Sequence, residues 1–468
     1  MKILKYTYIL GASALITITS CKKVVDILPT DTIETTKAYE NTTDLDKGAL
    51  GAYSALYEEN HLYTAAIMSD EVRWAADNVA RNYGIEHKWD FDSGAGNVTA
   101  AWANLYTTID RVNRALAAAD KITVADATDG AKRDRIKGEL LAIRAFSHFE
   151  LLRNFAAKYE PTAAGVPVML VSEISLPARK TFGEVIAAVE ADLAAAKTLI
   201  PASYAVSDYS RITRVAVSAI QARVALYNKE WDNAITYATE VINARPLATA
   251  SAYPAIWTDA SNTEVLFKLI RTTTTLNALW TDTNKDVFFS PSYKLIDSYD
   301  KVNDVRYATF IKQDLTVGSG REQWKVNKYP GQTSTILFNH VKVFRTSEMY
   351  LIRAEGYAQK ATPDLAGAAA SINALRANRI TGYSNVSYST AAAAIADIDL
   401  ERFRELAFEG HRYYDYRRRF TSIVRDPRDL TTAPNIKATL NTSDRNYELP
   451  IPTAELLANP NVVQNANY

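Results

Sequence analysis

Cysteine is almost absent from this chain, which carries one, Cys21, among 468 residues. A single thiol excludes an internal disulfide framework and any metal cluster held by several thiolates. Net charge is also absent, because 53 basic residues balance 53 acidic ones, so no overall field favours nucleic acid. Beyond the amino terminus, no apolar run approaches the length of a membrane span. The composition therefore predicts a globular chain whose one cysteine needs a separate explanation.

The signatures of common catalytic and metal sites are missing as well. The histidines, at positions 61, 87, 148, 340 and 411, are scattered without the H-E-x-x-H spacing of a zinc enzyme. There is no G-x-S-x-G elbow, no G-x-x-x-x-G-K-S/T loop and no G-x-G-x-x-G turn. Residues 282–287 begin like a calcium loop, but Val287 replaces the required glycine and Tyr293 the final glutamate. We expect no cofactor and no metal from these patterns, although a calcium site of another kind stays open.

One row of acidic residues remains to be explained. Glu401, Glu405 and Glu409 recur on one helical face, where like charges repel by about 0.2–0.5 kcal/mol per exposed pair. We therefore expect arginines opposite them, and the candidates are Arg345, Arg353, Arg402 and Arg412. A row of catalytic acids is the alternative, and a structural ion-pair network is the interpretation that we prefer.

The amino terminus has the pattern of a secretory signal. Lys2 and Lys5 precede a short apolar stretch, residues 9–18, which is too short to span a bilayer. The sequence Ile-Thr-Ser-Cys at 18–21 resembles the bacterial lipobox, whose cysteine is acylated through its sulfur. We therefore predict a lipoprotein signal peptide at 1–20, a lipid-bearing Cys21 and a polar tether to residue 43. The alternative is an ordinary signal peptide with an incidental cysteine.

Helical periodicity dominates from residue 44 onward. Apolar residues recur at spacings of three and four, which is typical of the buried face of an amphipathic helix. Three such faces are Leu45, Ala49, Ala52 and Leu56; Trp102, Tyr106, Ile109, Val112 and Leu116; and Ile136, Leu140, Ile143, Ala145, Phe149 and Leu152. Residues 212–244 and 346–379 each predict two helices with small residues at their crossing, which resembles the tetratricopeptide plan of about 34 residues.

Residues 247–344 differ from the rest of the chain. A β-branched, alternating stretch that ends near Ile270 predicts a strand, and turn-rich, aromatic sequence follows it. The aromatic residues are Trp280, Phe288, Phe289, Tyr293, Tyr299, Tyr307 and Trp324. A stretch of this length without helical periodicity, inside a helical protein, is typical of a functional region.

Six segments, in order along the mature chain, resemble the SusD/RagB family of outer-membrane nutrient-binding lipoproteins. They are residues 21–57, 139–170, 211–242, 343–358, 401–419 and 449–468, the last with Ala466 where proline is frequent. The resemblance implies an all-α-dominated fold of about four tetratricopeptide-like helix pairs packed against an irregular binding region with minor β structure. It divides the mature chain into a lipidated tether at 21–43, a SusD-like helical region at 44–246, a ligand-binding region at 247–344 and a carboxyl-terminal SusD/RagB region at 345–468.

The resemblance also implies a function and a partner. A protein of this kind is lipid-anchored in the outer membrane and exposed at the cell surface, where it captures an oligosaccharide and delivers it to a SusC-like TonB-dependent transporter. It is not an enzyme and binds no nucleic acid. An oligopeptide ligand is the alternative within the family. A glycoside hydrolase, and a scaffold that binds only other proteins, are the alternatives outside it.

Two segments combine the aromatic rings that stack on sugars with polar groups that bond hydroxyls. The candidate ligand-binding residues are Trp74, Asp77, Asn78, Arg81, Tyr83 and Trp89 in the first segment, and Trp280, Tyr293 and Trp324 in the second. In proteins of the family, the stretch corresponding to the first segment supplies binding aromatics. Packing is the alternative role for each ring. Trp102 and Trp231 lie on helical faces, so we expect them in the core.

Overall fold

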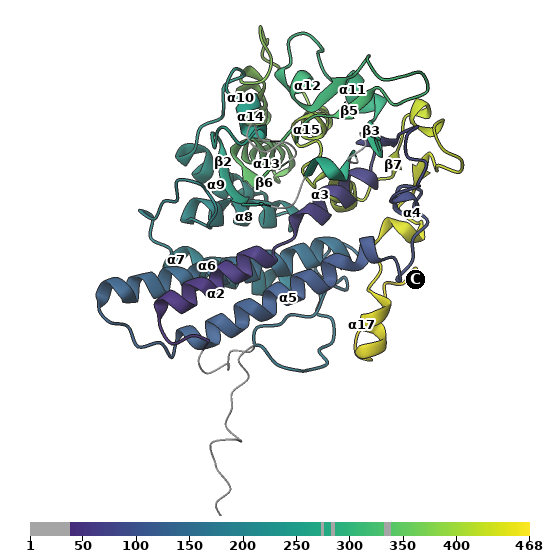
Figure 1. Ribbon diagram of the computed structural model, residues 1–468. Helices are drawn as coiled ribbons and strands as arrows, with labels where there is room; N and C mark the ends of the chain where they lie inside the picture. Colours follow the sequence, from purple (N-terminus) through teal and green to yellow (C-terminus); the bar gives the residue numbers. More distant parts are fainter. Residues whose placement is uncertain (1–37, 273–275, 282–285, 332–337) are drawn as a thin grey trace, which may run out of the picture.

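The protein is described by a computed structural model that covers residues 38–272, 276–281, 286–331 and 338–468. Long helices form one layer, and most of the short strands, turns and further helices lie above this layer in the view of Figure 1. The layer contains α2 (Thr42–Ala55), α5 (Gly96–Ala119), α6 (Ala127–Phe155) and α7 (Phe182–Leu199). Helix α2 packs on both α5 and α6, and α6 packs on α7. The predicted faces of α2 and α6 are fully buried, which confirms the periodicity.

Local sequence fixes where these helices begin. The Asp126 side chain caps α6 by accepting the backbone N–H of Asp129 at 2.9 Å. Helix α7 begins with a capping box, in which Thr181 and Glu184 each accept the other's backbone N–H. The burial of α6 is uneven, because every buried residue lies at or beyond Ile136. The second half of α6 therefore runs through the centre of the molecule.

Two helix pairs of the predicted kind are present, and they pack on each other. The first pair is α8 (Arg214–Tyr227) with α9 (Trp231–Ala244), and the second is α13 (Thr346–Gln359) with α14 (Leu365–Ala377). Helix α9 packs on α13 although a hundred residues separate them. Gly356 allows this approach, because a Cβ there would meet Ile235 Cγ1 at 2.8 Å. Helix α15 (Ala391–Glu405) packs on both α13 and α14.

The predicted strand is also present. β2 (Val265–Leu269) pairs antiparallel with β6 (Val341–Arg345), with register irregularities around Phe267. All residues of both strands are buried, so the alternation in the sequence does not mark an exposed face. Three more two-stranded ladders join β1 (Val72–Trp74) to β3 (Phe289–Pro291), β4 (Ile311–Gln313) to β5 (Trp324–Val326), and β7 (Ile423–Val424) to β8 (Thr439–Leu440). The structure is thus all-α-dominated with minor β, as predicted.

Short helices complete the chain. The α-helices are α3 (Glu58–Ile67), α4 (Gly84–His87), α10 (Tyr253–Trp257), α11 (Tyr293–Ser298), α12 (Val305–Phe310), α16 (Arg412–Arg419) and α17 (Thr453–Ala458). The 3₁₀ turns are η3 (Leu276–Leu279), η4 (Pro427–Leu430) and η5 (Arg445–Tyr447). One hydrophobic cluster extends from Leu45 to Val462 and takes residues from all three predicted regions of the mature body. The region boundaries themselves stay a prediction.

Among the residues that the structure describes, none of the helices combines the length and apolar character that a membrane crossing requires. The predicted signal peptide and Cys21 lie outside the described residues, as does most of the tether. The same holds for residues 282–285 of the calcium-like loop.

Candidate functional site

A strand ladder brings the two predicted ligand-binding segments together. β1, in the first segment, pairs with β3, in the second, so that Trp74 lies opposite Phe289 and Arg73 opposite Ser290. β3 also packs on β5, which begins at Trp324. Segments more than two hundred residues apart therefore meet at one place.

Arg73 stabilises this junction through a buried ion pair. Its two terminal nitrogens donate to the Glu322 carboxylate at 2.8 and 2.7 Å, and both side chains are buried. The same guanidinium lies 4.6 Å from the centre of the Tyr293 ring. A buried bidentate pair is geometrically specific, so Arg73 fixes Tyr293 relative to the start of β5.

Asp77 also stabilises the junction, through hydrogen bonds to three residues of the second segment. One carboxylate oxygen accepts from Arg321 Nε at 3.0 Å and from the backbone N–H of Glu322 at 3.1 Å, and the other accepts from the backbone of Val287 at 3.3 Å. Asn78 closes a local turn, because its amide bonds both the N–H and the carbonyl of Asn82. In this structure both predicted polar residues hold the loops in place.

Three of the predicted rings are buried. Trp89 has no exposed surface, donates its indole N–H to the Met68 carbonyl at 2.9 Å and lies under Arg425. Trp280 is equally buried and packs against Tyr63 and Phe408. Trp74 keeps 4% of its surface exposed. Rings covered in this way pack in the core, so the ligand-binding prediction depends on the more exposed members.

The more exposed members surround the same junction. Arg81 is exposed, and Tyr83, Tyr293 and Trp324 are half-buried. Arg321, which the sequence did not single out, joins them through its bonds to Asp77 and Asp286. We call these five residues, Arg81, Tyr83, Tyr293, Arg321 and Trp324, the aromatic rim. They bring partly exposed aromatic rings and guanidinium groups to the segments around the junction, and a sugar or a peptide can use that combination.

The backbone beside the rim is strained. Arg81, Tyr83 and Trp89 all have positive φ, at 57°, 51° and 53°. Residues with side chains rarely adopt this region, and such strain is concentrated at binding sites. Tyr83 is held there by an edge contact with Tyr63, whose ring centre lies 4.3 Å away. Asp429 lies next to the rim, because its carboxylate accepts the backbone N–H of Tyr293 at 3.0 Å. Burial raises the pKa of this carboxyl to about 6.

The row of acidic residues forms a buried ion-pair network, as the preferred interpretation predicted, but most of its partners differ from those expected. Arg345 does bond Glu405 and Glu409. The other partners come from distant segments: Arg306 and Arg376 bond Glu401, Arg306 and Arg379 bond Glu405, and Lys328 bonds Glu409. Of the remaining candidates, Arg402 bonds Asp415, Arg412 bonds Asp70 and Arg353 bonds Ser371, so those three partner predictions were wrong. Arg402 bonds on another face of α15, whereas Arg412 lies on α16 and Arg353 on α13, so spacing along the chain could not assign these partners.

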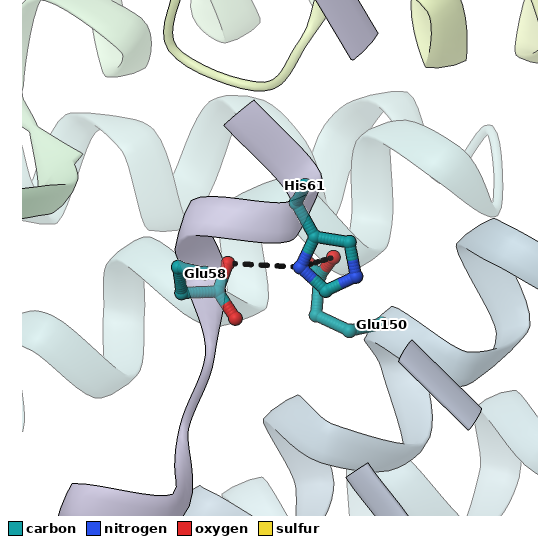
Figure 2. Close-up of side chains that lie close together, drawn as sticks. All are labelled: Glu58, His61 and Glu150. Atoms are coloured by element: carbon teal, nitrogen blue, oxygen red, sulfur yellow. Dashed lines mark hydrogen bonds and ion pairs between the residues drawn. The ribbon is translucent and has the colours of Figure 1, made fainter. Parts of the chain in front are cut away.

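A second buried cluster was not predicted from the sequence. His61 Nδ1 lies 3.3 Å from Glu58 Oε2 and 3.6 Å from Glu150 Oε2. Figure 2 shows the imidazole of α3 directed between the two carboxylates, one from its own helix and one from α6. All three side chains are buried. Their ligand atoms lie within 4.8 Å of one another, which is close enough to hold a metal ion.

The charges in this cluster are only partly balanced. Arg153 Nη1 donates to both oxygens of Glu150, at 2.6 and 2.8 Å. Burial raises the pKa of Glu150, but Arg153 and His61 outweigh it and hold that pKa below its ordinary value. Burial lowers the pKa of His61, but Glu58 and Glu150 outweigh it and raise that pKa. Glu58 Oε1 has no hydrogen-bond partner among the described residues.

A sequence signal for this cluster exists, although it differs from the zinc-enzyme pattern. Glu58 and His61 are separated by three positions, the Glu-x-x-His spacing that places a carboxylate and an imidazole on one helical face in carboxylate-bridged metal proteins. The third member, Glu150, is far away in the sequence. Only the tertiary structure, in which the Glu150 side chain of α6 reaches His61 of α3, brings it near.

Four cavities are formed by other parts of the described chain. The cavity beside Glu58 and His61 measures about 20 Å³. The other three measure about 150, 220 and 200 Å³; they lie beside Lys197, between Met169 and Ala458, and between α7 and α9. No residue of the aromatic rim lines any of them. The rim is thus separate from these four cavities.

Comparison with known proteins decides the family. A family model described as "SusD family" matches residues 322–468, and a second, described as "Starch-binding associating with outer membrane", matches residues 26–226. Together they cover most of the chain. This chain belongs to the SusD/RagB family. The curated SusD-like protein P2 of Formosa agariphila is 24% identical to it, over 99% of both chains.

Solved SusD structures share the fold from end to end. A SusD superfamily protein of Bacteroides thetaiotaomicron matches with a TM-score of 0.80 and 24% identity, over 91% of this chain and 99% of that one. A protein of Bacteroides vulgatus, named as a candidate sugar-binding protein, matches with a TM-score of 0.79 and 26% identity, over 92% of this chain and 99% of that one. The predicted family and fold class are confirmed.

Proposed function

We propose that this SusD/RagB protein binds a carbohydrate at the outer membrane and uses the aromatic rim as its ligand-binding surface. The observation that supports the proposal is the strand junction, in which β1 pairs with β3 and β3 packs on β5, so that the segments carrying Tyr293 and Trp324 meet although the sequence separates them from the first segment. The support from relatives is the family description of starch binding at the outer membrane and the sugar-binding name of the Bacteroides vulgatus protein.

The rim suits a sugar physically. A pyranose offers a face of C–H groups, which stacks on Tyr or Trp, and a border of hydroxyls, which arginine donors can bond. Two guanidinium groups lie over the Tyr293 ring, with Arg73 at 4.6 Å and Arg428 at 4.9 Å from its centre. They fix the orientation of this ring, so it loses little rotamer freedom on binding, and we assign the stacking contact with the sugar to Trp324.

The rest of the predicted function is part of the same proposal. Acylation at Cys21 would hold the protein on the membrane, and a SusC-like TonB-dependent transporter would receive the captured ligand. We propose capture without turnover, because no known catalytic motif was found in the sequence. An oligopeptide is the alternative ligand, since the arginines of the rim could also pair with peptide carboxylates.

Affinity electrophoresis of the full-length chain in detergent tests the proposal, with native gels that contain starch, other glucans or other polysaccharides. Trp324→Ala and Tyr293→Ala should abolish most of the retardation in the gel that binds the wild type. Trp231→Ala is the matched control, because Trp231, which the sequence placed wrongly in the core, is a half-buried tryptophan on α9, away from the rim. Equal retardation of wild type and both rim variants would refute the site. Release of reducing sugar would refute capture without turnover.

A further inference from the structure

We propose that Glu58, His61 and Glu150 form a zinc site that joins α3 to the central helix α6. This site is distinct from the aromatic rim and goes beyond carbohydrate binding. Two carboxylate oxygens and one imidazole nitrogen are a donor set that zinc accepts in proteins. The two separations from His61 Nδ1, 3.3 and 3.6 Å, match the edges of a zinc tetrahedron, which are about 3.3–3.6 Å for bonds of about 2.0–2.2 Å.

Glu58 supplies an observation that is independent of this geometry. It is 94% buried, and its Oε1 has no hydrogen-bond partner among the described residues. A buried carboxylate oxygen without a partner is costly, and a cation removes that cost.

The cavity beside the cluster provides a fourth position. Glu58 and His61 line its wall, and its volume of about 20 Å³ holds one water molecule. The cations on the same wall already have acidic partners: Arg223 pairs with Glu348 at 2.7 Å, and Lys342 pairs with Asp259 at 2.5 Å. Because Arg153 uses one lone pair of each Glu150 oxygen, a second lone pair remains for the metal.

Asn154 affects the zinc affinity of the site, because it contacts His61 Nε2. Its Oδ1 accepts the Tyr414 hydroxyl at 2.7 Å, so its Nδ2 faces both the Glu150 carbonyl and His61 Nε2, each at 2.7 Å. This arrangement places the ring proton on Nδ1, between the carboxylates. With zinc in that position, the ring proton would lie on Nε2, and the Asn154 amide would turn so that its oxygen accepts that proton, giving up the bond from Nδ2 to the Glu150 carbonyl. Histidine ligands of zinc normally donate their second N–H to an acceptor of this kind.

Zinc titration of the metal-stripped full-length chain in detergent, in competition with a chromophoric chelator, tests the proposal. We expect one equivalent to bind, and Glu58→Gln or His61→Ala to weaken binding at least tenfold. Glu59→Gln is the matched control, since Glu59 is the next residue of α3 and pairs with Arg271 instead. That variant should bind zinc as the wild type does.

Asn154→Asp provides a test in the opposite direction. A carboxylate at this position is a permanent acceptor for the Nε2 proton, so zinc affinity should rise about tenfold or more. Cobalt(II), bound in place of zinc, should give the visible absorption of a tetrahedral site in the wild type and lose it in His61→Ala. The proposal is overturned if the wild type binds no zinc, if Glu59→Gln weakens binding as much as Glu58→Gln, or if Asn154→Asp fails to tighten it.

Discussion

The buried ion-pair network makes a quantitative prediction at Glu401. This side chain has no exposed surface, and its two oxygens accept from Arg306 Nη1 at 2.5 Å and from Arg376 Nε at 2.7 Å. Replacing it by glutamine keeps the shape but leaves both guanidinium groups without their shared charge. Removal of one partner from a buried pair costs about 3–5 kcal/mol, so Glu401→Gln should lower the free energy of unfolding by that amount at pH 7.

The pH dependence of this loss identifies its cause. Burial raises the pKa of Glu401, but Arg306 and Arg376 outweigh it and lower the pKa from 4.5 to about 2. A carboxyl with a lowered folded-state pKa stabilises the protein above its unfolded pKa and loses that contribution as the pH falls toward the folded value. The full contribution is about 3 kcal/mol, and about 2 kcal/mol of it is lost between pH 7 and pH 3. The difference between wild type and Glu401→Gln should therefore shrink by about 2 kcal/mol over this range.

Urea unfolding followed by tryptophan fluorescence, at pH 7 and at pH 3, measures both quantities. Glu173→Gln is the control, because Glu173 is exposed on the loop before α7; its effect should stay within about 0.5 kcal/mol. A Glu401→Gln effect below about 1 kcal/mol at pH 7 would contradict the assigned pairing. An effect of equal size at both pH values would show that the carboxylate charge is not its source.

Three further predictions concern stability. Gly356→Ala should lower the free energy of unfolding by about 1–3 kcal/mol, because the new methyl group forces α13 away from α9. A Cβ at Gly51 would meet nothing within 4 Å, so Gly51→Ala should stabilise α2 by about 0.5–1 kcal/mol. Thermal unfolding compares the two variants, and equal effects would contradict the close approach of α13 to α9. Burial raises the pKa of Glu71 to about 8. The wild type should therefore lose stability relative to Glu71→Gln as the pH rises from about 4.5 to 8. If the free energies of unfolding in urea differ between the two proteins by the same amount at every pH, the raised pKa is contradicted. Thr181→Ala removes the capping box of α7 and should cost about 1 kcal/mol in the same measurement, and no change would show that the cap contributes nothing.

Much of the helical layer could be predicted from the sequence because each helix repeats its apolar face locally. The four residues assigned to the buried face of α2 are all fully buried, and the strand at Val265–Leu269 was also found. The acidic row at Glu401 was correctly interpreted as an ion-pair network, since like charges at that spacing require compensation. Its partners could not be predicted, because Arg306 and Arg376 reach it from other segments.

The amino-acid sequence by itself determined the helical class, the helix pairs and the family, since these depend on periodicity and on motifs that are contiguous along the chain. Tertiary structure alone decided which aromatic rings are covered: Trp280 is buried and Trp324 half-buried, although both lie in the irregular region 247–344. It also decided that Glu150 meets Glu58 and His61. The physical reason is the same in both cases, because burial and charge pairing depend on contacts between distant segments, and no local pattern encodes those contacts.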